Sequence, residues 1–181
     1  MPQPPPLPAD KLRRVLRISG FDGYTLVFIA GGFGLVSLTT GDWLGWGVGT
    51  LAAVCGLIEL RGRRQLRSGE LRGLNALISS QLLVLALILG YLAYQIGHYD
   101  PRPMIEMVDH ALAEALQAQG QETMTLADWL GLTKPQLLAL AKSSARQTYI
   151  AAGLLSVLCQ GGLAYYYHRK RPDIARALRK S

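Results

Sequence analysis

A histidine and several carboxylates lie close together in one stretch of the chain, where they could do chemistry. They are Asp100, Glu106, Asp109, His110 and Glu114. Carboxylates and an imidazole at this spacing can bind a cation or act as acid and base in hydrolysis. The solvated acidic face of an amphipathic helix explains the same residues and is the favoured interpretation. Glu106, Asp109, His110 and Glu114 are therefore only a weak candidate site.

Other reactive side chains are too few and too scattered for a metal or redox centre. His98, His110 and His168 are the three histidines, and none lies in the middle of an apolar segment, where two could hold a haem. Cys55 and Cys159 lie within apolar segments and are interpreted as small buried residues. Motifs for zinc, a nucleophile elbow or a nucleotide phosphate loop are missing. The sequence predicts no catalytic residues, no metal and no cofactor, and favours a non-enzymatic protein.

Four long apolar segments make up much of the chain and must position any functional side chains. Of the 181 residues 50% are hydrophobic and only 17% are charged, which is below the usual share in globular proteins. The segments cover residues 21–40, 43–60, 74–97 and 148–167, close to the ~20 residues that cross a bilayer. Their acids, Asp22 and Glu59, lie near segment ends, where we expect the carboxylates to reach headgroups or water. We therefore predict an all-α membrane protein with four transmembrane helices.

Basic residues are distributed unevenly around these segments. Clusters precede the first segment, separate the second from the third and follow the fourth, whereas few bases lie in the other connections. By the positive-inside rule, both termini are cytoplasmic, in a plasma membrane or a bacterial inner membrane. The bases expected to contact anionic headgroups are Arg61, Arg63, Arg64, Arg67, Arg72, Arg169, Lys170 and Arg171.

This topology divides the chain into five parts. They are a proline-rich and basic cytoplasmic tail (1–20), transmembrane helices one to three (21–97) with a basic cytoplasmic loop (61–73), an extracytoplasmic amphipathic helical loop (98–147), transmembrane helix four (148–167) and a basic cytoplasmic tail (168–181). In the long loop, the apolar spacing predicts one helix that ends at Gly120 and a second helix up to Gly131. A third begins at Thr133, where Gln136 completes a capping box. These helices either cap the bundle or lie on the membrane.

Part of this loop, TLADWLGLTKPQLLALAK, resembles a helix-turn-helix in its apolar spacing. The residues at the core positions of that motif are Leu126, Ala127, Leu130, Gly131, Leu132 and Leu138. The second helix carries only Lys134 and Lys142 as bases, and the charge rule places it outside the cell. We therefore expect no nucleic-acid partner.

Small residues at helical spacing predict how the first two spans pack. They are Gly31 and Gly34 in the first span and Gly41, Gly45, Gly49 and Ala53 in the second. A spacing of four puts the second set on one face, where another backbone can approach closely. The short connection makes the two spans antiparallel neighbours, so packing within one chain is favoured over an interface between copies.

Polar side chains inside the later spans are the remaining candidates for function. They are Asn75, Ser79, Ser80, Gln81, Gln95 and Gln160. Amides in membrane helices face the bundle interior or a wet cavity, because an unpaired amide is costly in hydrocarbon. Gln81 and Gln160 are the best candidates, either for hydrogen bonds between helices or for contact with a transported species.

These observations favour a polytopic membrane protein that acts as a non-enzymatic interaction or assembly component and forms a homo-oligomer. The alternative is a small oligomeric channel or transporter with a pore lined by polar positions of helices three and four. The expected partners are membrane lipids and either a second copy of the chain or another membrane protein.

Overall fold

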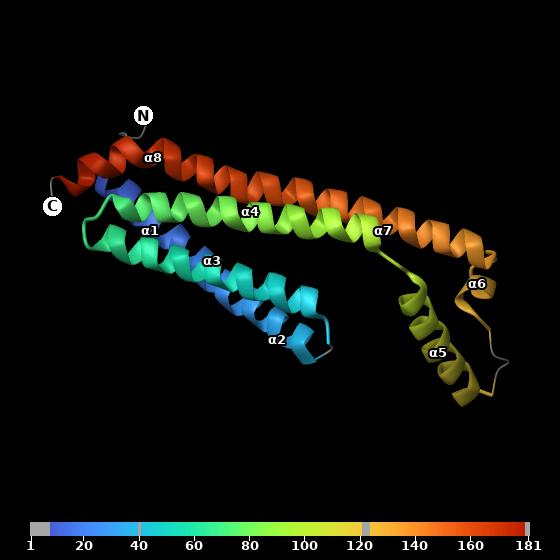
Figure 1. The fold of residues 1–181 in the computed structure, drawn as a ribbon. Helices are drawn as coiled ribbons and strands as arrows, with labels where there is room; N and C mark the ends of the chain where they lie inside the picture. The colour runs from blue at the N-terminus through green and yellow to red at the C-terminus, as the bar shows by residue number, and fades with distance from the viewer. Residues whose placement is uncertain (1–7, 40, 121–123, 180–181) are drawn as a thin grey trace, which may run out of the picture. The chain divides into compact units, whose positions relative to one another are not determined.

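The computed structural model describes residues 8–39, 41–120 and 124–179, and every regular element in these ranges is helical (Figure 1). In chain order the elements are α1 (Pro8–Thr25), η1 (Leu26–Ala30), α2 (Gly31–Thr39), α3 (Trp43–Arg67), α4 (Arg72–His98), α5 (Arg102–Ala118), α6 (Leu126–Trp129), α7 (Lys134–Ser156), η2 (Val157–Gly161) and α8 (Gly162–Leu178). The elements η1 and η2 are π-helical and continue directly into their neighbours.

Four helices in the described ranges are long and apolar enough to cross a membrane. They cover Asp10–Thr39, Trp43–Arg67, Arg72–His98 and Lys134–Leu178. Large apolar side chains on them are open to the surroundings: Phe21 is 77% exposed, Phe28 75% and Leu158 73%. Such a surface is unfavourable in water and suits hydrocarbon. Within the described ranges, the prediction of an all-helical chain is confirmed, and so is the prediction of four helices long and apolar enough to cross a membrane.

The helices extend further than the hydropathy predicts. The basic stretch expected as a loop over 61–73 is helical up to Arg67 and again from Arg72, so the turn is only four residues long. The expected tails are also helical where the structure describes them, from Pro8 in α1 and up to Leu178 in α8. Basic side chains are good helix formers, and their aliphatic stems cover apolar surface while the charge stays solvated. Hydropathy therefore located the apolar part of each helix and missed its polar end.

The chain forms two compact units, and α4 and α7 each contribute to both. The first unit comprises Met1–Tyr91 and Leu154–Ser181, and the second comprises Leu92–Gly153.

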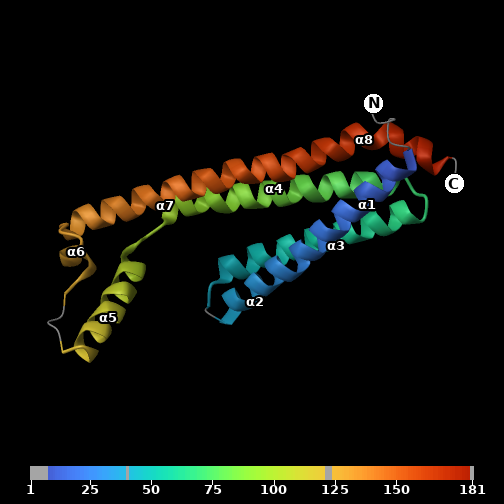
Figure 2. The same ribbon diagram turned by 180° about the vertical axis from the view of Figure 1, so that it is seen from behind.

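Within the first unit, the start of α1 and the end of α8 lie beside the turn between α3 and α4 (Figure 2). A core of fully buried apolar side chains joins α1, α3, α4 and α8 there; its buried members are Val15, Leu66, Leu74, Leu77, Tyr167 and Ile174. An ion pair of 2.8 Å between Lys11 Nζ and Asp173 Oδ2 also links α1 to α8.

Glycines allow α3 to lie directly against η1 and α2. A Cβ atom added to Gly49 would be 2.7 Å from the Ala30 oxygen and from backbone atoms of Gly34, so no side chain fits there. One turn earlier in the helix, a Cβ on Gly45 would meet the Ser37 hydroxyl. The glycines predicted from spacing therefore lie between the helices of one chain, as close-packed membrane helices require.

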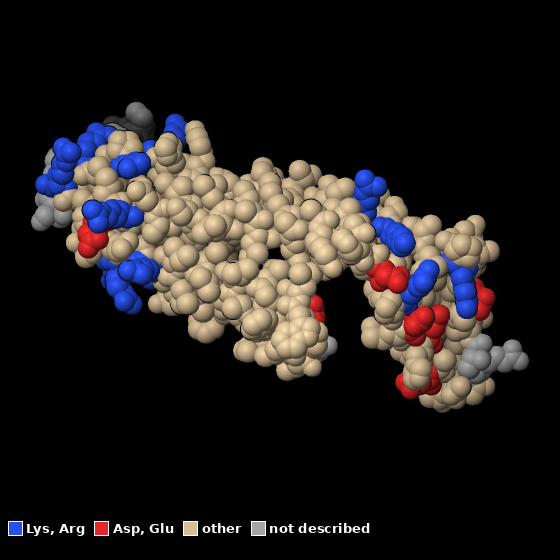
Figure 3. Space-filling view, viewed as in Figure 1, with Lys and Arg blue, Asp and Glu red and all other residues tan. Residues whose placement is uncertain are grey.

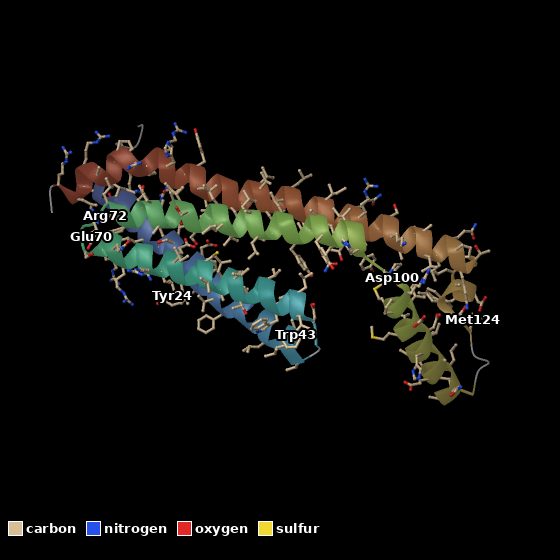
Figure 4. The ribbon with its side chains drawn as sticks, in the orientation of Figure 1. Tyr24, Trp43, Glu70, Arg72, Asp100 and Met124 are labelled. Carbon is tan, nitrogen blue, oxygen red and sulfur yellow. The ribbon has the colours of Figure 1, made fainter. Side chains whose placement is uncertain are left out.

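Gly41 is the exception to the predicted packing stripe. It lies in the turn before α3 with φ of 76°, and nothing is within 4 Å of a Cβ built on it. Its role is to let the backbone enter a left-handed conformation, which glycine adopts at low cost. The turn leads to Asp42, whose side chain caps α3, and to Trp43 at the end of the hairpin opposite Glu70 and Arg72 (Figure 4).

The second unit is held together by caps and ring contacts. Thr125 and Asp128 form a capping box at α6, and the Thr133 backbone nitrogen donates to Gln136 Oε1 at 2.9 Å before α7. The ring of Tyr99 meets the ring of Tyr149 edge-on, with 6.0 Å between the centroids. Turns at Gly120 and Gly131, with φ of 69° and 65°, end the preceding helical segments.

A carboxylate cluster within the membrane-spanning helices

One amide joins two carboxylates inside the first unit. Gln81 of α4 is fully buried, and its Nε2 atom donates to Asp22 Oδ2 of α1 at 2.6 Å and to Glu59 Oε2 of α3 at 2.9 Å. Glu59 itself is 0% exposed, and Asp22 is half-buried. Both carboxylates therefore lie within a few ångströms of each other in the interior of the helix bundle.

A fourth helix completes this carboxylate cluster of Asp22, Glu59, Gln81 and Tyr167. The fully buried Tyr167 of α8 donates from its hydroxyl to the second carboxylate oxygen of Glu59, Oε1, at 3.4 Å. Next to Gln81, the buried Ser80 hydroxyl donates to the Cys55 carbonyl oxygen at 2.6 Å, which fixes α4 against α3. Each of the four helices that are long and apolar enough to cross a membrane thus contributes one member of the cluster.

The cluster lies where the apolar part of the first unit meets its basic end. On α3, Glu59 comes one turn before Arg63, and on α8, Tyr167 directly precedes the basic run that starts at His168. Lys and Arg side chains gather at this end of the unit in the view of Figure 3. The cluster is therefore about one helical turn from charged residues, along an axis with a rise of about 1.5 Å per residue.

The cluster carries an unusual excess of acid. No Lys, Arg or His in the described ranges forms an ion pair with Asp22 or Glu59. Two negative charges at this separation repel each other by roughly 3–4 kcal/mol even at an effective dielectric constant of about 20. A neutral amide and a phenol offer hydrogen bonds without cancelling charge, so the double anion requires a further positive charge.

Three buried polar atoms near this region have no hydrogen-bond partner among the described residues. They are Gln81 Oε1, Gln160 Oε1 and Arg63 Nε. The Arg63 guanidinium lies against Gly20, where an added Cβ would be 2.7 Å from Cζ. Buried polar groups are almost always paired, so unpaired ones point to a bound water or ligand, or to a second arrangement of the side chains. The Gln81 side chain is therefore paired at one atom and unpaired at the other: Nε2 donates to the two carboxylates, and Oε1 has no partner among the described residues.

Two π-helical turns lie in the helices that carry this site. The first, η1, begins four residues after Asp22, and the second, η2, contains Gln160 and ends six residues before Tyr167. A π-turn adds one residue to the helical repeat and frequently occurs at functional sites. The hydropathy pattern gave no sign of either turn.

The predicted intramembrane polar residues have different environments. Ser80 and Gln81 are buried, Gln95 and Gln160 are half-buried, and Asn75 and Ser79 are exposed. Gln81 is the residue among them that belongs to the carboxylate cluster.

The acidic cluster of the second unit is divided among several contacts. Asp109 Oδ1 accepts a hydrogen bond from the Leu126 backbone nitrogen at 2.6 Å, which joins α5 to α6. His110 and Glu114 are exposed and approach to 3.4 Å on the surface of α5. Glu106 lines a separate cavity of about 210 Å³. Among the described residues, no group of three or more His, Cys, Asp or Glu is placed to hold a metal ion.

The segment that resembles a helix-turn-helix begins with α6, which has four residues. A single turn is too short to act as the supporting helix of that motif.

Most of the predicted headgroup-contacting bases are exposed in the first unit. The exposed ones are Arg61, Arg64, Arg67, Arg72, Arg169 and Arg171. Lys170 is half-buried, with its Nζ atom 5.9 Å from the centre of the Tyr166 ring, and Arg63 is half-buried against Gly20.

The expectation that Asp22 and Glu59 reach water or headgroups is wrong for Glu59, which is completely buried. The carboxylate is near the end of the apolar segment, but α3 continues and α1, α4 and α8 surround it. The signal was present in the sequence, because an acid within a membrane span is costly and is usually retained for function. The partners could not be found from spacing, since they come from three other helices.

Comparisons with known proteins gave no match to a family model, a curated protein or a solved structure.

Proposed function

We propose that the protein is a small membrane transporter or channel that carries a proton or a small inorganic cation through the carboxylate cluster. The observation that supports this most directly is the Gln81 amide that joins the buried carboxylate of Glu59 to the half-buried carboxylate of Asp22. Acids inside a membrane bundle are typical of ion and proton pathways, where the bound species compensates the buried charge. A purely structural amide contact would not need two acids.

Flux through reconstituted protein tests this proposal. Vesicles that contain the wild-type protein should pass H⁺, Na⁺ or K⁺ down an imposed gradient, and Glu59→Gln should reduce that flux to the level of protein-free vesicles. Glu70→Gln is the matched control, because Glu70 is exposed in the turn between α3 and α4 and should be replaceable without loss (Figure 4). Equal flux in wild type and Glu59→Gln, or no flux of any of the three ions, contradicts the proposed function.

The orientation that we propose keeps both termini and the turn between α3 and α4 in the cytoplasm, and α5 to α6 outside. It rests on the basic residues of the first unit and the acidic character of α5. In a background without Cys55 and Cys159, an impermeant thiol reagent added to intact cells should label Met107→Cys and leave Ser68→Cys unlabelled. Both positions are exposed, so accessibility on the surface is matched. The reverse labelling pattern would refute the orientation.

A role in assembly is the second candidate function, and one surface of α4 favours it. Ala86, Gly90, Ala93 and Gly97 are exposed and recur at helical spacing, and a Cβ on Gly90 or Gly97 would have nothing within 4 Å. Small residues on a membrane helix allow a second helix to approach closely. We expect a homo-oligomer in native lipid, disrupted by Gly90→Leu; a monomer by mass measurement would contradict this expectation.

A further inference from the structure

We propose that the species held by the carboxylate cluster is a proton and that Asp22 and Glu59 share it. This inference deepens the proposed function, on which it rests, by naming the transported class. The first argument is the chemistry of the atoms that face the two carboxylates. Gln81 offers an N–H group to both, and Tyr167 offers an O–H group to Glu59.

A metal ion needs a different set of atoms. Na⁺, K⁺ and divalent ions are bound by several oxygen lone pairs that converge on one point. Here the amide nitrogen donates a hydrogen bond to Asp22 Oδ2 at 2.6 Å and another to Glu59 Oε2 at 2.9 Å. That position is the one a bridging cation would need. Turning the amide over would set its oxygen against two carboxylates, which is unfavourable unless they are already neutralised.

A proton satisfies the same cluster without moving any helix. Uptake of one proton forms an O–H bond on either carboxylate, removes one negative charge and leaves a single anion with the hydrogen bonds from Gln81 and Tyr167. Release to a water molecule breaks that O–H bond and restores the carboxylate. Two interacting acids of this kind take up and lose protons as a pair.

The unpaired Gln81 oxygen gives the second, independent observation. Gln81 is fully buried, and its Oε1 atom has no donor among the described residues. An unpaired buried acceptor calls for an O–H or N–H group, as supplied by a water molecule that delivers or receives the proton. Gln160 Oε1 of η2 is a second unpaired buried acceptor among the described residues, close to two turns before Tyr167 along the same continuous helix.

The charged and titratable groups around Glu59 come from α1, α8 and α3 itself, whereas α4 contributes the neutral amide of Gln81. Asp22 lies on α1, Tyr167 on α8, and Arg63 lies one turn further along α3, with its guanidinium against Gly20. The only cation among them, Arg63, forms no ion pair with either acid in the described part of the chain. The described residues therefore provide no positive charge for these two acids, and a bound proton supplies it.

Two measurements on the full-length protein in vesicles test the assignment. Infrared spectra at neutral pH should contain a protonated-carboxyl band that shifts in D₂O, disappears in Glu59→Gln and in Asp22→Asn, and persists in the control Glu70→Gln. A pH gradient should drive H⁺ flux at the same rate in Na⁺, K⁺ or choline buffer, and this flux should be lost in the two cluster variants. The infrared band does not depend on transport, so it tests the inference separately from the proposed function.

Each combination of outcomes has one meaning. Na⁺ or K⁺ flux that depends on Glu59, without the infrared band, overturns the proton and retains a cation transporter. The band without any flux supports the shared proton and removes the proposed function. A band that is absent, or unchanged in Glu59→Gln and Asp22→Asn, overturns the inference whatever the flux.

Discussion

Replacing Gly49 with valine is expected to lower the stability of the protein by about 3 kcal/mol or more, at the upper end of what overpacking costs. The reason is the distance of 2.7 Å from an added Cβ to the Ala30 oxygen and to backbone atoms of Gly34. Backbone cannot rotate away as a flexible side chain does, so α3 must separate from η1 and α2. The midpoint of thermal unfolding in detergent or lipid vesicles measures the loss.

Gly47→Val is the matched control for this prediction. Gly47 lies on the same helix two residues away, and nothing is within 4 Å of its added Cβ. The variant has the same change in volume and in helix propensity, so it should lose little stability. Equal losses in the two variants would mean that the helix propensity of valine, and not the close approach of the backbones, determines the result.

The spacing of small residues was a good guide to this contact. Gly45 and Gly49 recur every four residues, and such a period can only align one face of a helix. Because the connection between the first two spans is short, the first span is the expected neighbour of that face. Gly41 extended the same period but precedes α3, because the Asp42 cap starts the helix after it. Periodicity predicts a face, whereas the end of a helix depends on a local cap.

The tetrapeptide ELRG occurs twice, at residues 59–62 and 70–73, and illustrates a contact that periodicity does not reveal. Its glycines, Gly62 of α3 and Gly73 of α4, face each other across the helices, and a Cβ on Gly62 would be 2.8 Å from the Gly73 oxygen. Glycine weakens a helix, yet Gly62 and Gly73 both lie within helices. The close packing of Gly62 against Gly73 outweighs that cost.

The carboxylate cluster was predictable in part. Gln81 was identified because an amide in an apolar helix needs a partner. Its partners were missed because Asp22, Glu59 and Tyr167 are distant in the chain, and no local rule connects them. Hydropathy also treats a residue near the end of an apolar segment as exposed, while the burial of Glu59 depends on how far α3 continues and on what surrounds it.

Gln81→Leu is expected to be the most damaging polar substitution in the spans, with a loss of about 3 kcal/mol. Its Nε2 atom makes two hydrogen bonds to the pair of acids, one of which is an anion when the pair shares a proton. A hydrogen bond to a charged group contributes about 1.5–3 kcal/mol and one to a neutral group about 0.5–1.5 kcal/mol. Leucine keeps the volume but leaves the buried Glu59 and the half-buried Asp22 without their bridge. Asn75→Leu, an exposed amide on the same helix, is the control and should change stability little.

A double-mutant cycle separates the bridge from simple loss of packing. In a Glu59→Gln background the cluster has one acid fewer, and the new amide at position 59 can itself donate to Asp22. Gln81→Leu should therefore cost less there, with a coupling energy of about 1–3 kcal/mol between positions 59 and 81. Additive losses would show that Gln81 contributes only its packing volume. The hydrogen bonds of 2.6 and 2.9 Å would then contribute nothing to the stability of the packing between α1, α3 and α4.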